Sequence, residues 1–301
     1  MRERSQGARN GGPQVWSIGI FGGRSPFDLA PLPGIDNPVL TADDIRDVPA
    51  GFVADPFMIH ADDTWFMFLE VMNRNTRKGE IALAKSEDGF AWSYQRVVLA
   101  EPFHISYPCV FKWNGVYFMI PETRRAGAIR LYRADSFPDV WHYAGDLLCI
   151  EGADPSVFQC GGRWWMFVCA PASGHETLRL YLADALTGPW SEHPCSPIIS
   201  GDPLRARSAG RVTCFNGMAI RYAQECHPHY GTRVRAFEIV EITPETYVER
   251  EIERPVLAAS GSGWNQDGMH HIDAHLCGDE WIACVDGWRF LNQGTPRDSA
   301  R

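Results

Sequence analysis

The chain has 301 residues, and its 28 Lys and Arg against 37 Asp and Glu give a net charge of −9 with His neutral. Because nucleic acids and anionic membranes are bound by clustered cations, this balance argues against either as the main partner. Hydrophobic residues make up 45% of the chain, which is enough for a full core and too much for a disordered chain.

The sequence shows no membrane or secretion signal. No stretch approaches the roughly 20 apolar residues of a membrane-spanning helix, and residues 1–12 lack the apolar core of a signal peptide. We therefore expect a cytoplasmic protein without a membrane span. The nine cysteines are scattered singly between Cys109 and Cys284, which favours reduced thiols over a disulfide scaffold or a Cys-ligated zinc site.

Short alternating aromatic runs predict strands rather than helices. Residues 57–68 form an apolar strand, a polar turn and an aromatic strand, which is typical of a hairpin. A second copy contains Asn114-Gly115, which favours a type I′ turn because both positions must tolerate a positive φ. The second to fifth copies of the hairpin lie at 110–120, 157–167, 212–222 and 272–284, and the last of them is weaker.

The residues after each of the first three hairpins also repeat. Each segment has a third strand, a turn and a Trp that begins a fourth strand: 81–92, 129–141 and 178–190. The period is about 50 residues, within the range of propellers and arrays. The sequence therefore predicts an all-β five-bladed β-propeller with four-stranded antiparallel blades, with an irregular β-sandwich as the alternative.

The repeats also suggest how the chain is divided. We expect residues 51–290 to form the propeller and residues 291–301 to form a flexible tail. Residues 1–50 are an N-terminal extension, rich in Pro and Gly from Trp16 onward, which we expect to supply the strand that completes the last blade.

Candidate catalytic residues lie where the blades begin, because the first strand of every propeller blade lines the central channel. Asp55 and Asp154 precede proline at equivalent positions in blades one and three. Asp-Pro is also a common turn dipeptide, so two turn caps are the alternative. Two carboxylates that face one cavity can divide acid and base work, as glycoside hydrolysis requires. Glu122, at the end of a strand in blade two, is either a third acid or an exposed loop residue.

These features resemble a known superfamily. The five repeats, the Asp-Pro openings and the Gly-Met-His-His segment at 268–271 are similar to the five-bladed propellers of the family 43 glycoside hydrolases and their furanosidase relatives. Within that superfamily, the chain most resembles the N-terminal domain of the plant glucosamine inositolphosphorylceramide transferases and its bacterial stand-alone relatives. The segments that carry this resemblance are 107–108, 121–123, 207–211, 222–226, 230–231 and 286–288.

The resemblance implies roles for individual residues. It implies that Asp55 is the general base that activates water, and that Asp154 tunes the pKa of the acid and orients it. It also implies that His270 or His271 reaches a central metal or water, so a divalent cation such as calcium could bind in the channel with His271 as a ligand. A hydrogen-bonded set of histidines is the alternative reading of this strand.

The sequence departs from the glycosidase pattern at the opening of blade four. Where those enzymes present their general-acid glutamate, this chain has Arg207-Ser208-Ala209-Gly210-Arg211. Loss of a positioned acid costs roughly 10²- to 10⁴-fold in rate, so either Glu122 or Glu225 substitutes for it or the site binds a ligand without cleaving it. The two arginines would suit a phosphate or carboxylate on the ligand, or form surface ion pairs.

We therefore expect three catalytic residues, Asp55, Asp154 and Glu122. The residues expected to bind substrate are Tyr107, Arg207, Arg211, Gln224, His270 and Asp286. The first functional hypothesis is a glycoside hydrolase-like enzyme acting on a small-molecule, glycan or glycoconjugate substrate. The alternatives are a carbohydrate-binding module that serves a glycosyltransferase or biosynthetic partner enzyme, and a non-hydrolytic cyclase or isomerase of natural-product metabolism.

Overall fold

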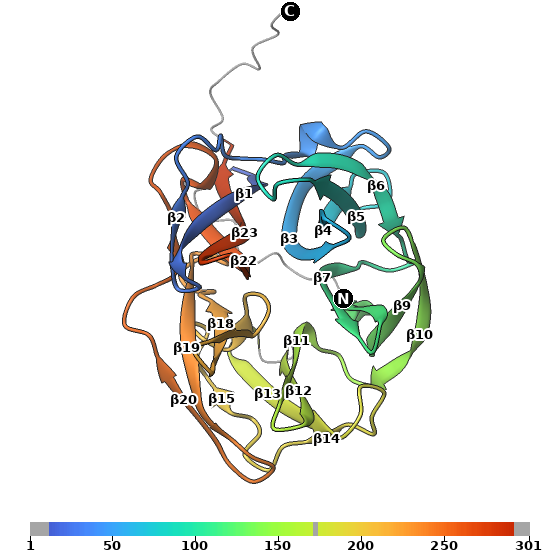
Figure 1. Cartoon of the computed structure of the whole chain (residues 1–301), viewed down its shortest axis with the longest axis vertical. Helices are drawn as coiled ribbons and strands as arrows, with labels where there is room; N and C mark the ends of the chain where they lie inside the picture. Colours follow the sequence, from blue (N-terminus) through green and yellow to red (C-terminus); the bar gives the residue numbers. More distant parts are fainter. Residues whose placement is uncertain (1–11, 171–173, 292–301) are drawn as a thin grey trace, which may run out of the picture.

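In a computed structural model that describes residues 12–170 and 174–291, five antiparallel sheets stand around a central channel (Figure 1). This arrangement confirms the predicted five-bladed β-propeller. Apart from Leu291, the predicted tail at 291–301 lies outside the described residues, as do residues 1–11 of the predicted extension. Within the described ranges, no helix has both the length and the apolar character needed to cross a bilayer.

The first three blades follow the chain from the inner strand to the outer strand. Blade one has β3 (Ala50–Ala61), β4 (Thr64–Asn73), β5 (Lys78–Ser86) and β6 (Ser93–Leu99). Blade two has β7 (Ser106–Trp113), β8 (Val116–Glu122), β9 (Ile129–Ser136) and β10 (Val140–Leu148). Blade three has β11 (Ala153–Cys160), β12 (Arg163–Cys169), β13 (Thr177–Ala183), β14 (Ser191–Glu192) and β15 (Ile199–Ser200).

The last two blades depart from this plan. In blade four the inner strand is split into β16 (Arg207–Ser208) and β17 (Thr213–Phe215), which both pair with β18 (Met218–Gln224); β19 (Arg233–Ile242), β20 (Tyr247–Glu251) and β21 (Leu257–Ala258) complete the sheet. Blade five runs from β22 (Gly268–Cys277) through β23 (Glu280–Phe290) to β1 (Gln14–Ser25) and β2 (Asp28–Pro31). It therefore joins strands from both ends of the described chain. Among the residues that the structure describes, three short 3-10 helices lie between strands: η1 (Ala42–Asp44), η2 (Arg124–Ala126) and η4 (Gly263–Asn265).

Local sequence explains the hairpins. Asn114 and Gly115 have φ values of 48° and 79°, which confirms the left-handed pair that a type I′ turn needs. The Trp of the repeated turn also has a fixed role, because its indole N–H donates to a backbone carbonyl three or four residues earlier. This hydrogen bond is 3.0 Å for Trp92, 2.8 Å for Trp141 and 3.0 Å for Trp190.

The apolar core lies between blades. One cluster packs Ile18 and Cys284 of blade five against Val53 and Met67 of blade one, and all four side chains are fully buried. Similar clusters join the other blades, so each sheet buries both of its faces against its neighbours. This packing fixes the inner strands at the channel wall.

The inner strands of blades one, two and three share a bulge. The residue before proline in each strand, namely Asp55, Tyr107 or Asp154, has a φ of 52°, 50° or 47°. In each case the pairing register with the next strand shifts at this point. Proline fits after the bulge because it has no N–H to lose from the interrupted ladder. The same distortion therefore directs three side chains at the channel.

Polar contacts across the channel tie opposite blades together. The Tyr107 hydroxyl lies 2.7 Å from Ser156 Oγ and accepts a hydrogen bond of 2.8 Å from the Gly210 N–H, so blade two reaches blade four. Gly210 also forms a parallel bridge with Ile272 of blade five. These bonds fill the channel at one level and leave its mouth open to solvent.

This close approach makes Gly210 the position most sensitive to a methyl group. Its φ is 137°, and a Cβ there would lie 1.7 Å from the Ile272 carbonyl oxygen, a backbone atom that cannot move aside. We expect Gly210→Ala to lower the free energy of unfolding by about 3 kcal/mol or more, measured by denaturant titration.

Gly217→Ala is the matched control, because Gly217 has a φ of 78° and open space around it. We expect it to cost about 1 kcal/mol. Equal losses in the two variants would contradict the clash.

Candidate functional site

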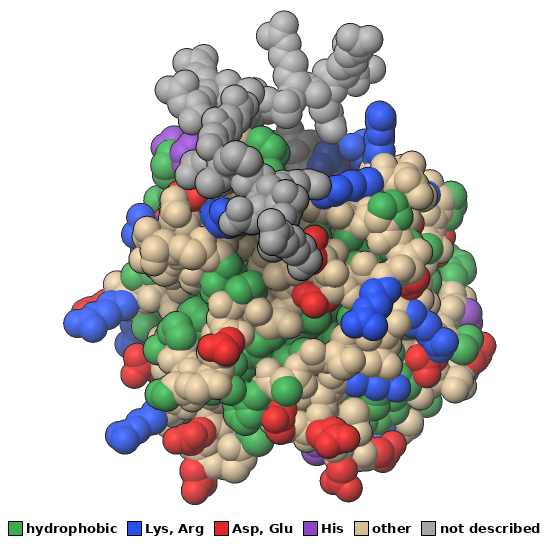
Figure 2. All heavy atoms as spheres, turned by 90° about the horizontal axis from the view of Figure 1, so that it is seen from above, with side chains coloured by type: hydrophobic (Ala, Val, Ile, Leu, Met, Phe, Trp, Pro, Cys, Tyr) green, Lys and Arg blue, Asp and Glu red, His purple; other side chains and the backbone are tan. Residues whose placement is uncertain are grey.

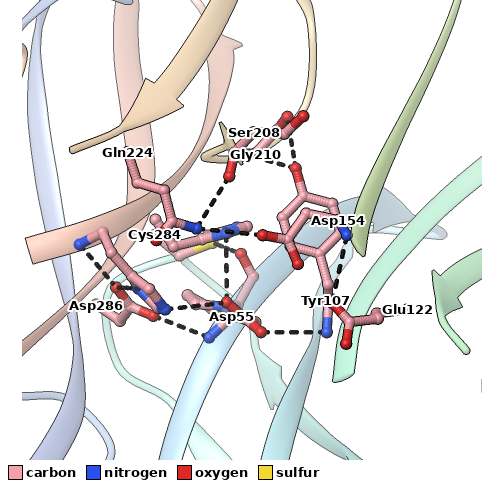
Figure 3. A network of polar contacts seen from close by, with 12 residues as sticks. Asp55, Tyr107, Glu122, Asp154, Ser208, Gly210, Gln224, Cys284 and Asp286 are labelled. Atoms are coloured by element: carbon pink, nitrogen blue, oxygen red, sulfur yellow. Dashed lines mark hydrogen bonds and ion pairs between the residues drawn. The ribbon is translucent and has the colours of Figure 1, made fainter. Parts of the chain in front are cut away.

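A cavity of about 230 Å³, here called the channel cavity, opens at one end of the central channel. Residues of blades one, two, four and five line it: Gln14, Trp16, Phe52, Ala54, Asp55, Glu70, His104, Ser106, Glu122, Arg207, Tyr230 and His270. Its volume is below the roughly 300 Å³ at which pockets for drug-sized ligands begin, so it suits a single small group such as one sugar ring. Figure 3 shows how carboxylates from separate blades converge beside it.

Asp55 lies in the wall of this cavity, on the bulge of β3. Its backbone N–H donates to Asp286 at 2.9 Å, and its Oδ2 accepts from the Tyr107 N–H at 3.2 Å. Its Oδ1 lies 3.6 Å from His270 Nε2 and 3.7 Å from His271 Nδ1. Burial raises the pKa of Asp55 to about 7, against the opposing effect of His270. This carboxyl group can therefore exchange a proton near neutral pH.

Asp286 sets the orientation of His270. The Asp286 carboxylate, fully buried on β23, accepts from His270 Nδ1 at 2.6 Å. With Nδ1 held by Asp286, Nε2 is the nitrogen that faces Asp55. Burial alone would lower the pKa of His270, but the Asp286 carboxylate raises it above the ordinary value. The Trp16 ring packs against the imidazole with a centroid distance of 4.3 Å.

Asp154 and Arg207 form a bidentate ion pair. Arg207 Nε lies 2.6 Å from Oδ2 of Asp154, and Nη2 lies 3.2 Å from Oδ1. Gln224 also donates to Oδ2 of Asp154 at 3.2 Å. Although burial opposes ionisation, the guanidinium holds the pKa of Asp154 below its ordinary value. Asp154 is thus a permanently charged partner of Arg207 rather than a group that exchanges protons.

Glu122 is a carboxyl group suited to donate a proton. It ends β8, and its Oε2 accepts from the Asp154 N–H at 3.3 Å and lies 3.5 Å from Arg207 Nη2. Burial and the charge of Asp154 raise its pKa to about 8, despite Arg207. Glu122 lies in the wall of the channel cavity. It is thus not the exposed loop residue that the sequence left open as the alternative.

A fourth carboxyl group, Glu70, was not predicted from the sequence. Glu70 pairs with Ala54 across blade one as Glu122 pairs with Ser106 across blade two, so the two glutamates are equivalent. Within the described part of the chain, Glu70 Oε1 is buried without a hydrogen-bond partner. Burial, with the nearby carboxylates, raises the pKa of Glu70 well above its ordinary value.

The sequence contains a signal that would have found Glu70. It lies 15 positions after Asp55, and Glu122 lies 15 positions after Tyr107. Three other lining residues, Trp16, His104 and Tyr230, carry no comparable signal because they come from connecting segments or from the strand that closes the ring.

Several residues expected to bind substrate do not line the cavity. The Tyr107 side chain is fully buried in its contacts with Ser156 and Gly210. Gln224 is held between Asp154 and the Ser208 carbonyl. Asp286 lies behind His270, so it is a positioning residue.

Three more residues singled out from the sequence do not line the cavity: Arg211, expected to bind substrate, His271, expected to bind a metal, and Glu225, a candidate substitute for the missing acid. Arg211 pairs with Asp273 at 2.7 Å, and Glu225 pairs with Arg233 at 2.8 Å and Arg235 at 2.5 Å. His271 is buried next to Asp55, and burial lowers its pKa to about 4, so it remains neutral. Of the two arginines at the blade-four opening, only Arg207 faces the cavity.

One group in the described residues, Asp55, His270 and Asp286, offers three potential metal-ligand atoms within 4.8 Å of one another. Both Asp286 oxygens already accept N–H bonds, from Asp55 and from His270. The Asp55 carboxylate and His270 Nε2 remain as donors, whereas calcium takes six to eight oxygen ligands. These donors do not provide a calcium shell, and the predicted calcium site with His271 stays a prediction.

Comparisons with known proteins bear on both the sequence and the fold. Residues 8–288 match the family described as glucosamine inositolphosphorylceramide transferase 1, N-terminal. The chain is 34% identical to glucosamine inositolphosphorylceramide transferase 1 of Oryza sativa subsp. japonica, over 98% of this chain and 43% of that protein. It therefore spans less than half the length of this relative.

Solved structures share the fold at low sequence identity. A β-1,2-mannobiose phosphorylase from Listeria innocua aligns with a TM-score of 0.63 and 14% identity, over 83% of this chain and 94% of that one. A thermostable family-43 glycoside hydrolase aligns with a TM-score of 0.52 and 15% identity, over 66% of this chain and 74% of that one.

The buried carboxyl group of Glu70 should cost stability, because its Oε1 accepts no hydrogen bond and its basic neighbour, His104 Nε2, lies 3.6 Å away. Because its pKa is raised in the folded state, the folded protein binds more protons than the unfolded chain, and stability is lost as pH rises above about 4.5. We expect Glu70→Gln to stabilise the fold by about 1–3 kcal/mol at pH 8 and by less at pH 5, measured as the shift in Tm.

Asp286→Asn provides the contrast. That carboxylate is equally buried but accepts N–H bonds, so its neutralisation should lower Tm. A Tm for Glu70→Gln that falls at pH 8 would contradict the cost assigned to Glu70.

Proposed function

The chain belongs to the family of the N-terminal domain of glucosamine inositolphosphorylceramide transferase 1, as its sequence resemblance predicted, and we propose that it cleaves a glycosidic bond of a sugar held in the channel cavity. The observation that carries this proposal is the pair Asp55 and Glu122. Both carboxyl groups line one cavity, and their surroundings give them different tendencies to hold a proton.

In the proposed reaction, Glu122 is the general acid and Asp55 is the general base. A water molecule attacks the anomeric carbon and gives a proton to Asp55, while the leaving oxygen takes the proton of Glu122. Asp154 contacts Glu122 through its backbone N–H and neutralises Arg207 through its side chain. In this proposal Glu122 takes the place of the general acid that the opening of blade four lacks.

The walls of the cavity also suit a sugar. Trp16, Phe52 and Tyr230 give it aromatic surfaces, on which the C–H faces of a sugar ring can pack. The carboxyl groups of Glu70 and Asp55, with His270, offer polar contacts to hydroxyl groups. The name of the relative, glucosamine inositolphosphorylceramide transferase 1, supports a sugar ligand. The glycosyltransferase partner predicted from the sequence belongs to the alternative of a carbohydrate-binding module.

Substitution of the two proposed catalytic groups tests the reaction. We expect Asp55→Asn and Glu122→Gln each to lower turnover of a glycan or aryl-glycoside substrate by about 10²- to 10⁴-fold, with Tm unchanged or raised. The control is Asp139→Asn, a surface carboxylate that pairs with Arg96 in the outer parts of blades one and two. The products are identified by mass spectrometry.

The mass of the product separates the alternatives. Two products whose masses sum to that of the substrate plus one water indicate hydrolysis, whereas an isomer of unchanged mass indicates a cyclase or isomerase. Saturable binding without any product indicates a carbohydrate-binding module. Full turnover in Asp55→Asn would rule out its role as the base.

The pH profile provides a second test. Asp55, with a pKa of about 7, must be ionised to act as a base, so activity should fall as pH decreases below 7. Glu122, with a pKa of about 8, must be protonated to act as an acid, so activity should also fall as pH rises above 8. We expect a bell-shaped profile of kcat/KM with a narrow maximum between these values. A flat profile from pH 5 to pH 9 would contradict the assignment.

A further inference from the structure

A second cavity, of about 460 Å³, lies beside the channel cavity, and His104 and Glu122 line both. Its other lining residues are Arg77, Lys78, Phe103, Arg124 and Arg125, and we call it the basic cavity. Arg77 and Lys78 lie at the β4–β5 connection of blade one, and the two other arginines belong to η2 of blade two. The basic cavity therefore extends the site outward between these two blades.

The charge of the basic cavity is opposite to that of the protein. Four basic side chains and one carboxyl group line it, whereas the whole chain has a net charge of −9. The Glu122 carboxyl group is turned toward the Asp154 N–H and Arg207. Figure 2 shows the uneven charge of the surface, with basic side chains gathered at the upper right and acidic side chains along the lower part.

The positions of Lys78 and Arg124 are fixed without full neutralisation of their charges. Lys78 Nζ donates to the Glu101 carbonyl at 2.8 Å, a contact that orients the ammonium group but leaves its charge. Arg124 Nε lies 3.8 Å from Glu151, a carboxylate that is 69% exposed, and such surface pairs contribute little. Both cations can therefore accept an anionic partner.

Backbone strain supports a functional reading of this connection. Arg77 has a φ of 56°, in the left-handed region that costs a non-glycine residue about 1–3 kcal/mol. Its N–H donates to the Asn73 carbonyl at 2.8 Å, which closes the turn and holds Arg77 and Lys78 at the cavity. A glycine would avoid this strain but would supply no charge.

We propose that the basic cavity binds the phosphate group of a glycoconjugate whose sugar enters the channel cavity. This inference rests on the proposed function, because it takes the channel cavity as the sugar site. Guanidinium groups suit phosphate, since each can donate two parallel hydrogen bonds to its oxygens. A soluble sugar phosphate and the phosphodiester of a lipid headgroup present the same chemistry here, with the sugar next to the phosphate.

The test compares probes that carry one or both groups. Calorimetry with glucose, inorganic phosphate and glucose 1-phosphate measures the contribution of each part. Vesicles of phosphatidylcholine with and without phosphatidylinositol, tested by sedimentation, report on a lipid source. The variant is Arg124→Gln/Arg125→Gln. Its control is Arg163→Gln/Arg250→Gln, which removes two charges from exposed ion pairs in blades three and four.

We expect wild-type protein to bind glucose 1-phosphate, or the vesicles with phosphatidylinositol, at least tenfold more tightly than glucose or plain vesicles. The Arg124/Arg125 double variant should lose this gain and keep the affinity for glucose, and the control should keep both. Tight binding of glucose 1-phosphate alone assigns a soluble sugar phosphate, and binding of the vesicles assigns a lipid headgroup.

The proposal is overturned if the phosphate adds no affinity in either form, or if the double variant keeps the full gain. Failure of the proposed function looks different: no sugar is turned over, yet the phosphate gain still depends on Arg124 and Arg125. That result leaves the phosphate contact in place, so the two failures are distinguishable.

Discussion

The site depends on one backbone constraint, the left-handed residue that precedes proline in the inner strand of three successive blades. A non-glycine residue in this conformation costs about 1–3 kcal/mol, and the fold accepts this cost at Asp55, Tyr107 and Asp154. At each position the strand is displaced by a bulge, and the side chain leaves the alternation of the sheet. The bulge delivers Asp55 to the cavity, Asp154 to Arg207 and Tyr107 to the opposite blades.

The raised pKa values of Glu122 and Glu70 follow from how few cations face the carboxyl groups of the channel cavity. Arg207 is the arginine of the channel cavity, and it is already shared between Asp154 and Glu122. Since Asp154 takes the bidentate contact, Glu122 and Glu70 remain without a full counter-charge, and burial raises the pKa of both. The ion pair of Asp154 and Arg207 thus leaves two further carboxyl groups of the cavity with a raised pKa. The basic cavity carries the complementary charge but lies outside the channel.

The sequence predicts the fold well because the repeats carry local signals. Asn114-Gly115 and the turn tryptophans specify hairpins through backbone geometry that does not depend on distant residues. The convergence of Asp55 and Asp154 follows from their equivalent places in two repeats. The partner of Arg207 could not be predicted, because it depends on how blades three and four pack. Glu70 was missed because it is a single acid within an apolar strand, and only the spacing shared with Glu122 reveals it.

Blade five pairs β1 with β23 over ten residue pairs, from Gln14↔Phe290 to Gly23↔Trp281. This pairing has a kinetic consequence, because its partners are separated by nearly the whole sequence and such contacts form slowly. During synthesis, β1 leaves the ribosome first, but its partner strand is made last. The edge of β1 therefore stays unpaired until the ring closes, and His270 meets Trp16 only at that final step. The candidate site, whose lining includes Trp16 of β1 and His270 of β22, is therefore complete only when the pairing of β1 with β23 has closed the ring.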